Sequence, residues 1–473
     1  MIKTETRILL VGFGPHAKRV YMKCFDEYGI TPALIVDLEC KRTEIGDYLS
    51  DRNMDVPVFG IDDKYRDCEE LPADAYTELQ ARVKKLGISH CIISTEPKAH
   101  KAYLLFCLEN HIHILVDKPL TAPKNVINDI NEAKKILEDY NIITDLYRKT
   151  TEQGPLTFQL QCQRRWHNGY RLAHKIVTEM IRKYNIPVTS MHITHCDGMW
   201  NMPDEFVSRE NHPYKYGYGK LFHSGYHFVD LLAWFASANN MIVEKKPDYA
   251  EMYASAVTAD DFMHIINKND YHKLLQTNKF DAIYNHYDDY HFDNYGEVDF
   301  NSILTFQKQG KTVMTATMNL LQDGFSRRSW PNLPEDTYKA NGRVRHEYVN
   351  IEIGPLMNIQ IHSYQSKEIS DRVVGRYTIG EVEHFNVYVF RNVGLIGGKP
   401  MEKYTLQELY DNEEIVLGFN ETARVRAFDE FINCSSDPNA IYDHKLGMLI
   451  LSKAYEALCR KHKGEATCIG FDL

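Results

Sequence analysis

The chain has 473 residues, more than one hydrophobic core usually serves, so we expect two domains. Apolar residues make up 44% and charged residues 25%, a mixture that excludes disordered and fibrous classes. The formal net charge of −10 excludes nucleic acid as the main partner, and no apolar window is long enough to predict a membrane span.

The first part of the chain alternates short apolar runs with helical patterns. Four runs are typical of buried parallel strands: 7–12, 33–37, 89–94 and 113–117. Residues 98–110 and 125–140 have the period of amphipathic helices, and 142–144 resembles another short strand. Strands separated by helices form a parallel sheet, so the pattern predicts an α/β domain over residues 1–155.

Apolar and polar residues alternate in the rest of the chain, as in strands with one buried face. The stretches with this pattern are 156–163, 188–195, 298–307 and 312–318. Residues 170–184, 423–432 and 446–460 are helical by period. We therefore predict an α+β domain over 156–473 with a mainly antiparallel open sheet, in which 262–297 is an insertion or a long loop with a little helix.

A glycine-rich turn follows the first predicted strand. In the sequence Gly12-Phe13-Gly14-Pro15-His16-Ala17, the first glycine allows a tight turn, the second lets the backbone approach a pyrophosphate, and the alanine replaces the glycine that packs the next helix. The phosphates would then face the N-terminus of that helix. The alternative is an ordinary glycine-rich turn of an α/β protein. We expect the cofactor contacts of this turn to come from Gly12, Phe13, Gly14, His16 and Ala17.

An acidic residue ends the second predicted strand. Asp37 stands where a carboxylate accepts hydrogen bonds from the adenosine ribose of a dinucleotide. A carboxylate repels a 2′-phosphate, so NAD is the expected cofactor. Lys41 and Arg42 keep NADP open as the alternative, although a solvated helix end also explains both cations.

Two segments resemble the Gfo/Idh/MocA family of sugar-type dehydrogenases. The first has Thr95 and His100 after the third predicted strand and Asp117-Lys118-Pro119 after the fourth, where the family has Glu-Lys-Pro. The resemblance implies that Thr95, His100, Asp117 and Lys118 lie at the cofactor. Asp117 keeps the charge of the usual glutamate but has a shorter reach.

The second segment runs from Gly217 to Asp230. Gly225, His227 and Asp230 match the family's pattern, whereas His223 stands where the family usually has aspartate. The resemblance covers 1–235 well and the last 50 residues loosely.

The resemblance implies a Rossmann domain joined to an open sheet. It also implies a small polyhydroxylated substrate and a homo-oligomer, a dimer or tetramer. Residues 240–415 are longer than in typical members, and both a lid and an extended oligomer interface remain open for them.

Hydride transfer at an alcohol needs a base for the hydroxyl proton and a positive group near the developing oxyanion. We assign Lys118 to the substrate oxygen and His227 to acid/base catalysis, although the two roles are exchangeable. Asp230, one helical turn after His227, would orient its ring, and His223 would lie on the same face. Arg164 and Arg165 are candidates to hold a carboxylate or phosphate of the substrate, and one of them is expected to be a surface charge.

Three functions are compatible with these residues. The first is an NAD-dependent dehydrogenase, the second a redox-neutral enzyme with tightly held NAD, and the third a dinucleotide-responsive regulator without catalysis. The substitutions Asp117 and His223 keep the third open, whereas Lys118, His227 and Asp230 favour an enzyme.

The sequence predicts no metal site. Residues 286–293 are rich in His and Asp but lack a known ligand spacing, and none of the ten cysteines forms a Cys-x-x-Cys pair. Because no signal-peptide pattern is recognised, we expect reduced thiols and a cytoplasmic protein.

Overall fold

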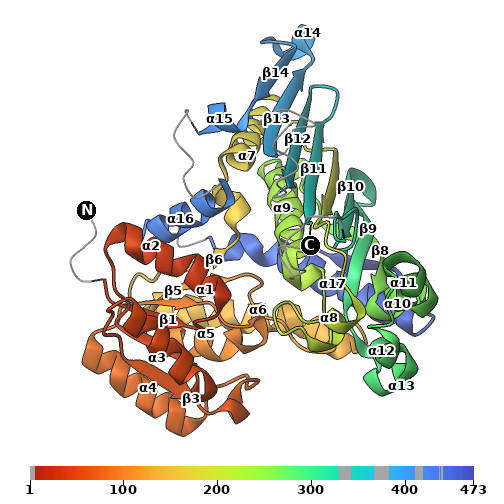
Figure 1. The fold of residues 1–473 in the computed structure, drawn as a ribbon. Helices are drawn as coiled ribbons and strands as arrows, with labels where there is room; N and C mark the ends of the chain where they lie inside the picture. The colour runs from red at the N-terminus through yellow and green to blue at the C-terminus, as the bar shows by residue number, and fades with distance from the viewer. Residues whose placement is uncertain (1–5, 330–341, 367–382, 411–418, 436, 438–439) are drawn as a thin grey trace. The chain divides into compact units, whose positions relative to one another are not determined.

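The computed structural model describes residues 6–329, 342–366, 383–410, 419–435, 437 and 440–473 (Figure 1). The chain divides into two compact units, and each is assembled from three separate segments. Unit 1 comprises Met1–Pro123, Ile136–His167 and Ile415–Met448. Unit 2 comprises Lys124–Lys135, Asn168–Glu414 and Leu449–Leu473.

Unit 1 contains, in its described residues, a six-stranded sheet of order β3-β2-β1-β4-β5-β6 (Figure 1). Its strands are β1 (Ile8–Val11), β2 (Leu34–Leu38), β3 (Val58–Ile61), β4 (His90–Ile93), β5 (His113–Asp117) and β6 (Phe158–Gln161). All of these neighbours pair in parallel. From β1 the chain adds β2 and β3 on one side and then crosses to add β4, β5 and β6 on the other side. Open α/β sheets bind ligands at such a point, outside the carboxyl ends of the strands.

Helices cover both faces of this sheet. One face carries α1 (Pro15–Arg19), α2 (Tyr21–Tyr28), α3 (Arg42–Asp51) and α16 (Phe419–Ile432). The other carries α4 (Ala73–Leu86), α5 (His100–Glu109) and α6 (Ile130–Thr151). Phe25 of α2 and Phe428 of α16 meet edge to face over the apolar strands, with ring centroids 5.8 Å apart. The last part of the chain therefore completes the core of its first domain.

Two local predictions for this unit are wrong. Residues 142–144 lie inside α6, where Ile143 is buried and Ile142 is exposed, as helical periodicity requires. Residues 156–163, predicted to open the second sheet, contain β6, which pairs with β5 in the first. All four residues of β6 are buried, because both faces of a parallel sheet are covered. Strand β3 was not predicted from the sequence.

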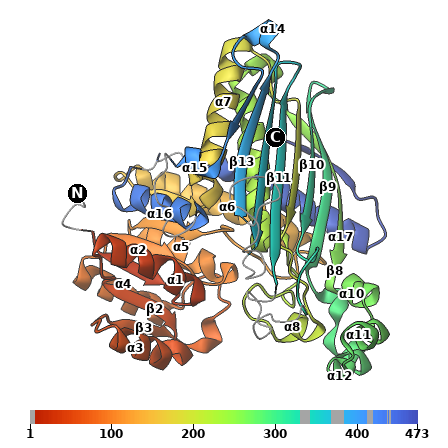
Figure 2. The same cartoon turned by 45° about the horizontal axis from the view of Figure 1, so that its top comes forward.

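Unit 2 contains, in its described residues, a nine-stranded sheet of order β14-β13-β12-β11-β7-β10-β9-β8-β15 (Figure 2). The strands are β7 (Ser190–Cys196), β8 (Tyr249–Thr258), β9 (Glu297–Lys308), β10 (Lys311–Leu321), β11 (Val344–Ile353), β12 (Met357–Ser366), β13 (Glu383–Arg391), β14 (Met401–Tyr404) and β15 (Cys468–Asp472). Apart from β7 with β10, the described pairs are antiparallel, which confirms the predicted open sheet. Strands β8 to β14 all lie in the described parts of 240–415, so this long region supplies seven of the nine strands of the sheet.

The helices of unit 2 are of two kinds. The longer ones are α7 (Asn168–Tyr184), α9 (Tyr226–Ser237) and most of α17 (Lys445–His462), and the short ones outside the insertion are α8 (Pro203–Ser208), α14 (Val393–Ile396) and α15 (Leu406–Leu409). The predicted insertion holds α10 (Ala259–Ile265), α11 (Lys268–Leu275), α12 (Asp281–Asn285) and α13 (Tyr287–Tyr290). Phe262 and Phe292 of the insertion pack in an apolar cluster with Phe206 and Tyr214, so the insertion contains more packed helix than predicted.

No helix in the described parts of the chain combines the length and the apolar character that crossing a membrane requires. All ten cysteines lie in the described residues, and none of them is bonded to another there by a disulfide.

Candidate active site

The predicted site residues of unit 1 lie at the carboxyl ends of its parallel strands. Gly12 follows β1, Asp37 lies near the end of β2, Thr95 follows β4, Lys118 follows β5 and Arg164 follows β6. Parallel strands bring their carboxyl ends to one edge of the sheet, so residues far apart in the sequence share that edge. Unit 1 therefore contains the whole predicted cofactor site together with Lys118.

The turn after β1 requires glycine at its first position. Gly12 has a φ of +87°, and a Cβ built on it would lie 2.6 Å from the carbonyl oxygen of Ser94. Gly14 has no heavy atom within 4 Å of the corresponding position, so space remains open above the turn. Ala17 is fully buried in the core. The helix that follows, α1, has only five residues, and Val20 separates it from α2.

Replacing Gly12 with alanine is expected to lower the free energy of unfolding by about 2–4 kcal/mol, because the positive φ and the contact with a neighbouring backbone both oppose a side chain. Gly14→Ala has room for its methyl group and is expected to cost less than about 1 kcal/mol, yet to weaken NAD binding. Urea unfolding and calorimetric titration with NAD measure the two effects. Gly46→Ala, inside α3 with open space around it, is the control; equal stability of Gly12→Ala and Gly46→Ala would contradict the prediction.

Asp37 fixes the glycine turn from the neighbouring strand. Its carboxylate accepts hydrogen bonds from the backbone N–H groups of Phe13 and Leu38, both at 2.7 Å. The nearby cations already have acidic partners, since Lys41 pairs with Glu44 and Arg42 with Glu39. Both cations are about half exposed, with 53% and 51% of their side-chain surface accessible, which agrees with a solvated helix end.

Asp117, at the end of β5, has partners from three other segments: α1, α2 and the loop after β4. The Tyr21 hydroxyl and the Ser94 hydroxyl each donate to it at 2.6 Å, and Nε2 of His16 lies 3.5 Å from Oδ2. Burial alone would raise the pKa of Asp117, but these partners hold the pKa well below its usual value. Asp117 therefore stays ionised and ties the end of β5 to the turn after β1.

Lys118 is half-buried beside this carboxylate. Burial lowers the pKa of Lys118 to about 8, while the charge of Asp117 counteracts the shift. The positive charges of Arg424 and Arg164 lower the pKa of Lys118 further. Arg164 is only 4% exposed, whereas Arg165 reaches the carbonyl oxygen of Asp443 at 3.4 Å near the surface. Unit 1 thus places three cations at the carboxyl end of the sheet.

Arg424 was not predicted from the sequence. This residue lies in α16, where its guanidinium donates to Gln163 at 3.2 Å and to Glu421 at 3.0 Å. The sequence signals for this segment were the helical period of 423–432 and the loose resemblance of the last 50 residues to the family, and neither indicates that Arg424 lies beside β6.

His100 is fully buried below the site. Its Nδ1 lies 3.1 Å from the carbonyl oxygen of Pro119 and 3.2 Å from that of Leu120, and its Nε2 lies 3.2 Å from that of Thr95. The ring therefore links the loop after β4 to the turn that carries Lys118, which is a positioning role.

Unit 2 holds the second group of predicted residues. His227 and Asp230 both lie in α9, and both are buried. His223 lies before this helix in the wide turn Leu221–Gly225 and has φ −76° and ψ −111°, which is not helical. The prediction that His223 shares a helical face with His227 is therefore wrong, because the N–H of Gly225 bonds back to the carbonyl of Lys220 and forms this turn instead.

A buried lysine at the start of this turn escaped the sequence analysis. Nζ of Lys220 lies 2.8 Å from Asp197, 2.9 Å from Ser224, 2.7 Å from the carbonyl oxygen of Leu321 and 3.1 Å from Nδ1 of His195. The Lys220 side chain is fully buried, and burial lowers its pKa. These contacts anchor the segment that leads to His223 and His227.

Comparison with known proteins supports this assignment of the fold. Residues 38–144 match the sequence model of the Gfo/Idh/MocA group, described as an oxidoreductase family with an NAD-binding Rossmann fold. The match confirms the resemblance and the NAD-binding character of the first domain. None of the curated proteins matches the sequence.

Three solved structures have similar folds. An oxidoreductase from Agrobacterium radiobacter, in complex with NAD+, L-tartaric acid and magnesium, is 11% identical, with a TM-score of 0.56 over 99% of this chain and 98% of that one. The WlbA dehydrogenase from Bordetella pertussis, in complex with NADH and UDP-GlcNAcA, is 12% identical, with a TM-score of 0.56 over 100% and 99%. Apo scyllo-inositol dehydrogenase from Lactobacillus casei is 11% identical, with a TM-score of 0.53 over 99% of each chain. At these identities the likeness shows a shared fold.

Proposed function

Because the first domain is the NAD-binding Rossmann fold of an oxidoreductase family, we propose that this protein is an NAD-dependent dehydrogenase acting on a polyhydroxylated substrate. The observation that carries the proposal is the position of Lys118, a half-buried lysine at the carboxyl end of β5, where such sheets bind ligands. When bound, the nicotinamide supplies the hydride acceptor or donor.

The residues of unit 1 suit this cofactor. The open turn at Gly14 admits a pyrophosphate, and Asp37 suits the adenosine ribose. Lys41 and Arg42 are paired with carboxylates of their own helix region, so we propose NAD rather than NADP.

Each chemical role is given to a residue of this chain. Lys118 binds the substrate oxygen and stabilises its developing negative charge, and His227 transfers the hydroxyl proton. Asp230 orients His227 from the next turn of α9. Arg164 would hold a carboxylate or phosphate of the substrate, since guanidinium groups bind such anions in a bidentate manner.

Two observations support our proposal for the substrate class: this set of cations and the ligand of one similar protein. Lys118, Arg164 and Arg424 favour a ligand that combines hydroxyl groups with a negative charge. L-Tartaric acid, found with one of the similar proteins, has both properties. We therefore propose a polyhydroxylated acid or a phosphorylated polyol.

The first experiment is release of dinucleotide from the purified protein, identified by absorbance and mass, followed by a substrate screen read as NADH formation. Weak, exchangeable NAD and net NADH formation support the dehydrogenase. Tightly held NAD with turnover but no net NADH would identify the redox-neutral alternative. NAD binding without turnover would identify the regulator, and failure to bind either dinucleotide would exclude all three.

The pH dependence separates the two assignments of Lys118. A lysine with a pKa of about 8 is charged below that pH and loses its proton above it. If the charged form stabilises the oxyanion, kcat/KM falls about tenfold per pH unit above pH 8. Lys118→Arg should move this decline to higher pH, because arginine stays protonated. A kcat/KM that instead rises through pH 8 in the wild type would make Lys118 the base.

We also propose that the protein is a homo-oligomer formed through the sheet of unit 2. Tyr253 and Ile303 are cross-strand neighbours on β8 and β9, and 44% and 52% of their surfaces are exposed. Adjacent exposed apolar side chains are typical of interaction surfaces. Light scattering on the wild type and on Ile303→Glu tests this, and an unchanged oligomer in the variant would exclude this face.

A further inference from the structure

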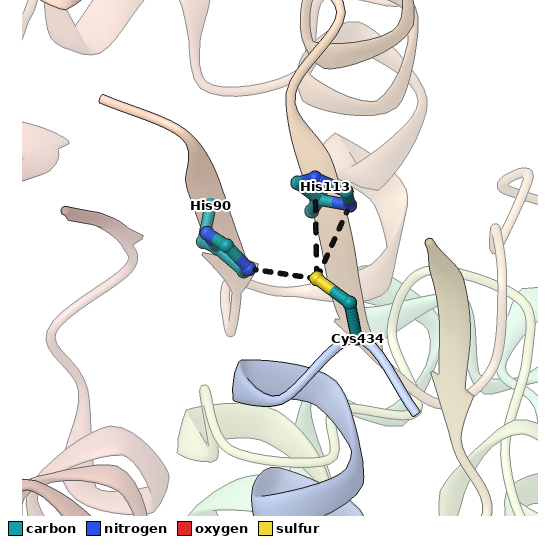
Figure 3. Close-up of side chains that lie close together, drawn as sticks. All are labelled: His90, His113 and Cys434. Atoms are coloured by element: carbon teal, nitrogen blue, oxygen red, sulfur yellow. Dashed lines mark hydrogen bonds between the residues drawn. The ribbon is translucent and has the colours of Figure 1, made fainter. Parts of the chain in front are cut away.

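A second cluster of ligand-type side chains lies in unit 1, away from the carboxyl ends of the strands. His90 is the first residue of β4 and His113 the first of β5, and the two are direct neighbours in the sheet. Cys434 follows α16. Figure 3 shows the two imidazole rings side by side, with the sulfur directed toward them.

The distances suit a shared ion. Sγ of Cys434 lies 3.4 Å from Nε2 of His90 and 3.8 Å and 4.0 Å from the two ring nitrogens of His113. One ligand atom from each residue lies within 4.8 Å of the others. Tetrahedral zinc separates its nitrogen and sulfur ligands by about 3.5 Å, given its usual bond lengths. The separation from His90, at 3.4 Å, is close to this value, whereas the separations from His113, at 3.8 and 4.0 Å, are somewhat longer.

We propose that His90, His113 and Cys434 form a binding site for a divalent cation of the zinc type. Imidazole and thiolate together select such ions over magnesium and calcium. His90 is 5% exposed, whereas His113 and Cys434 are half-buried, so the ion can enter from solvent and retain a water as fourth ligand.

His90 has the surroundings of a metal ligand. Its Nδ1 lies 2.8 Å from the hydroxyl of Ser89, which also accepts the N–H of Arg7 at 3.3 Å. When Nδ1 donates to Ser89, Nε2 presents its lone pair toward Cys434, as metal-binding histidines require. The ring of His113 stacks on that of His90 at a centroid distance of 4.6 Å, and the ring of Phe431 meets it edge to face at 5.2 Å. These contacts fix the orientation of the His90 ring.

His113 is the weaker ligand of the three. The backbone N–H of Thr157 donates to its Nδ1 at 2.9 Å. A cation has to compete with this N–H for the lone pair or cause the ring to turn. We therefore expect His90 and Cys434 to contribute most of the affinity, and His113 to complete the site.

The cation site is separate from the proposed active site. His113 and Asp117 lie at opposite ends of β5, and four residues of strand span about 13 Å. A bound ion would tie the chain after α16 to the amino ends of β4 and β5. Loss of the ion should therefore leave NAD binding intact, so this inference and the proposed function can fail independently.

The test uses the full-length, reduced protein and two metal probes. Zinc affinity is measured by competition with a chromophoric chelator, and cobalt(II) reports its ligands by absorption. We expect one cobalt per chain with a thiolate-to-cobalt charge-transfer band. Cys434→Ser should remove the band, and Cys434→Ser and His90→Gln should each weaken zinc binding more than about 100-fold, beyond the effect of losing an outer-shell partner. His113→Gln should weaken it about tenfold.

Cys40→Ser and Cys468→Ser are the controls, because both cysteines are exposed and lie outside the cluster. They should leave affinity and spectrum unchanged, and variants are compared after circular dichroism confirms their folding. If the wild-type protein binds cobalt but shows no thiolate-to-cobalt band, the proposal is contradicted. This outcome does not depend on the folding of any variant. The proposal is also contradicted if Cys434→Ser leaves the zinc affinity unchanged. Loss of zinc binding in Cys40→Ser or Cys468→Ser would contradict it in the same way.

Discussion

Replacing Lys118 with alanine is expected to lower kcat/KM for hydride transfer by about 10²–10⁴-fold, with little change in NAD affinity. The expectation rests on the environment of this side chain. Burial and the charges of Arg164 and Arg424 lower the pKa of Lys118 to about 8, so its proton is held less tightly than that of a surface lysine. A group of this kind can both stabilise an oxyanion and exchange a proton near neutral pH.

The measurement is single-turnover kinetics with the substrate identified in the screen, together with calorimetric titration of NAD. Lys64→Ala provides the control, since Lys64 is 62% exposed and pairs with Asp62 at the surface. Lys118→Arg should recover part of the activity, because it keeps the positive charge. Wild-type turnover in Lys118→Ala would remove this residue from catalysis, and a parallel loss of NAD affinity would assign it to cofactor binding.

Replacing Lys220 with methionine is expected to lower the free energy of unfolding by about 3–5 kcal/mol, the usual cost of removing one partner of a buried ion pair. The side chain of Lys220 and that of Asp197 are 0% and 2% exposed. Methionine fills the same volume but leaves the carbonyl oxygen of Leu321 and the other acceptors without the ammonium. Arg343 and Arg345 still bond to Asp197, which keeps the expected loss toward the lower end of the range.

Urea unfolding and thermal melting measure this loss, which corresponds to a fall in melting temperature of about 3–5 °C for a chain of this length. Lys64→Met is the matched control, for which we expect less than about 1 kcal/mol, as for other exposed pairs. Equal stability of the two variants would show that the contacts of Lys220 make no net contribution to the free energy of unfolding. Because Lys220 anchors the turn before α9, we also expect its variant to lose activity through misplacement of His227.

The parts of the site that sequence could predict are those encoded locally. Gly12, Asp37 and Lys118 each stand beside a strand of their own, and the strand order brings their carboxyl ends together. Arg424 and Lys220 escaped because their environments form between distant segments: Arg424 bonds to a residue 261 positions away, and Lys220 to one 101 positions away. Spacing rules carry no information about such pairs.

Fold errors had a similar origin. The alternation of Phe158 to Gln161 indicated one buried face, but glutamines in this strand are buried as well, and Gln159 donates to the carbonyl of Ala427 in α16. The run at 142–144 contains β-branched residues, which favour strands locally, yet burial of Ile143 and Tyr147 on one side of α6 stabilises the helix. In both cases tertiary packing prevailed over the local pattern.

Because unit 1 is assembled from three segments, its core cannot be completed until α16 has been synthesised. Phe428, Phe431 and Ile432 of α16 complete an apolar core whose other members, among them Phe25 and Ile35, lie near the start of the chain. A ribosome adding about 5–20 residues per second takes roughly 15–60 s to proceed from β6 to the end of that segment. Throughout this interval the emerging Rossmann domain exposes the surface that α16 later covers. Nascent chains of this protein should therefore stay bound to chaperones for longer than nascent chains of equal length whose first domain is one continuous segment.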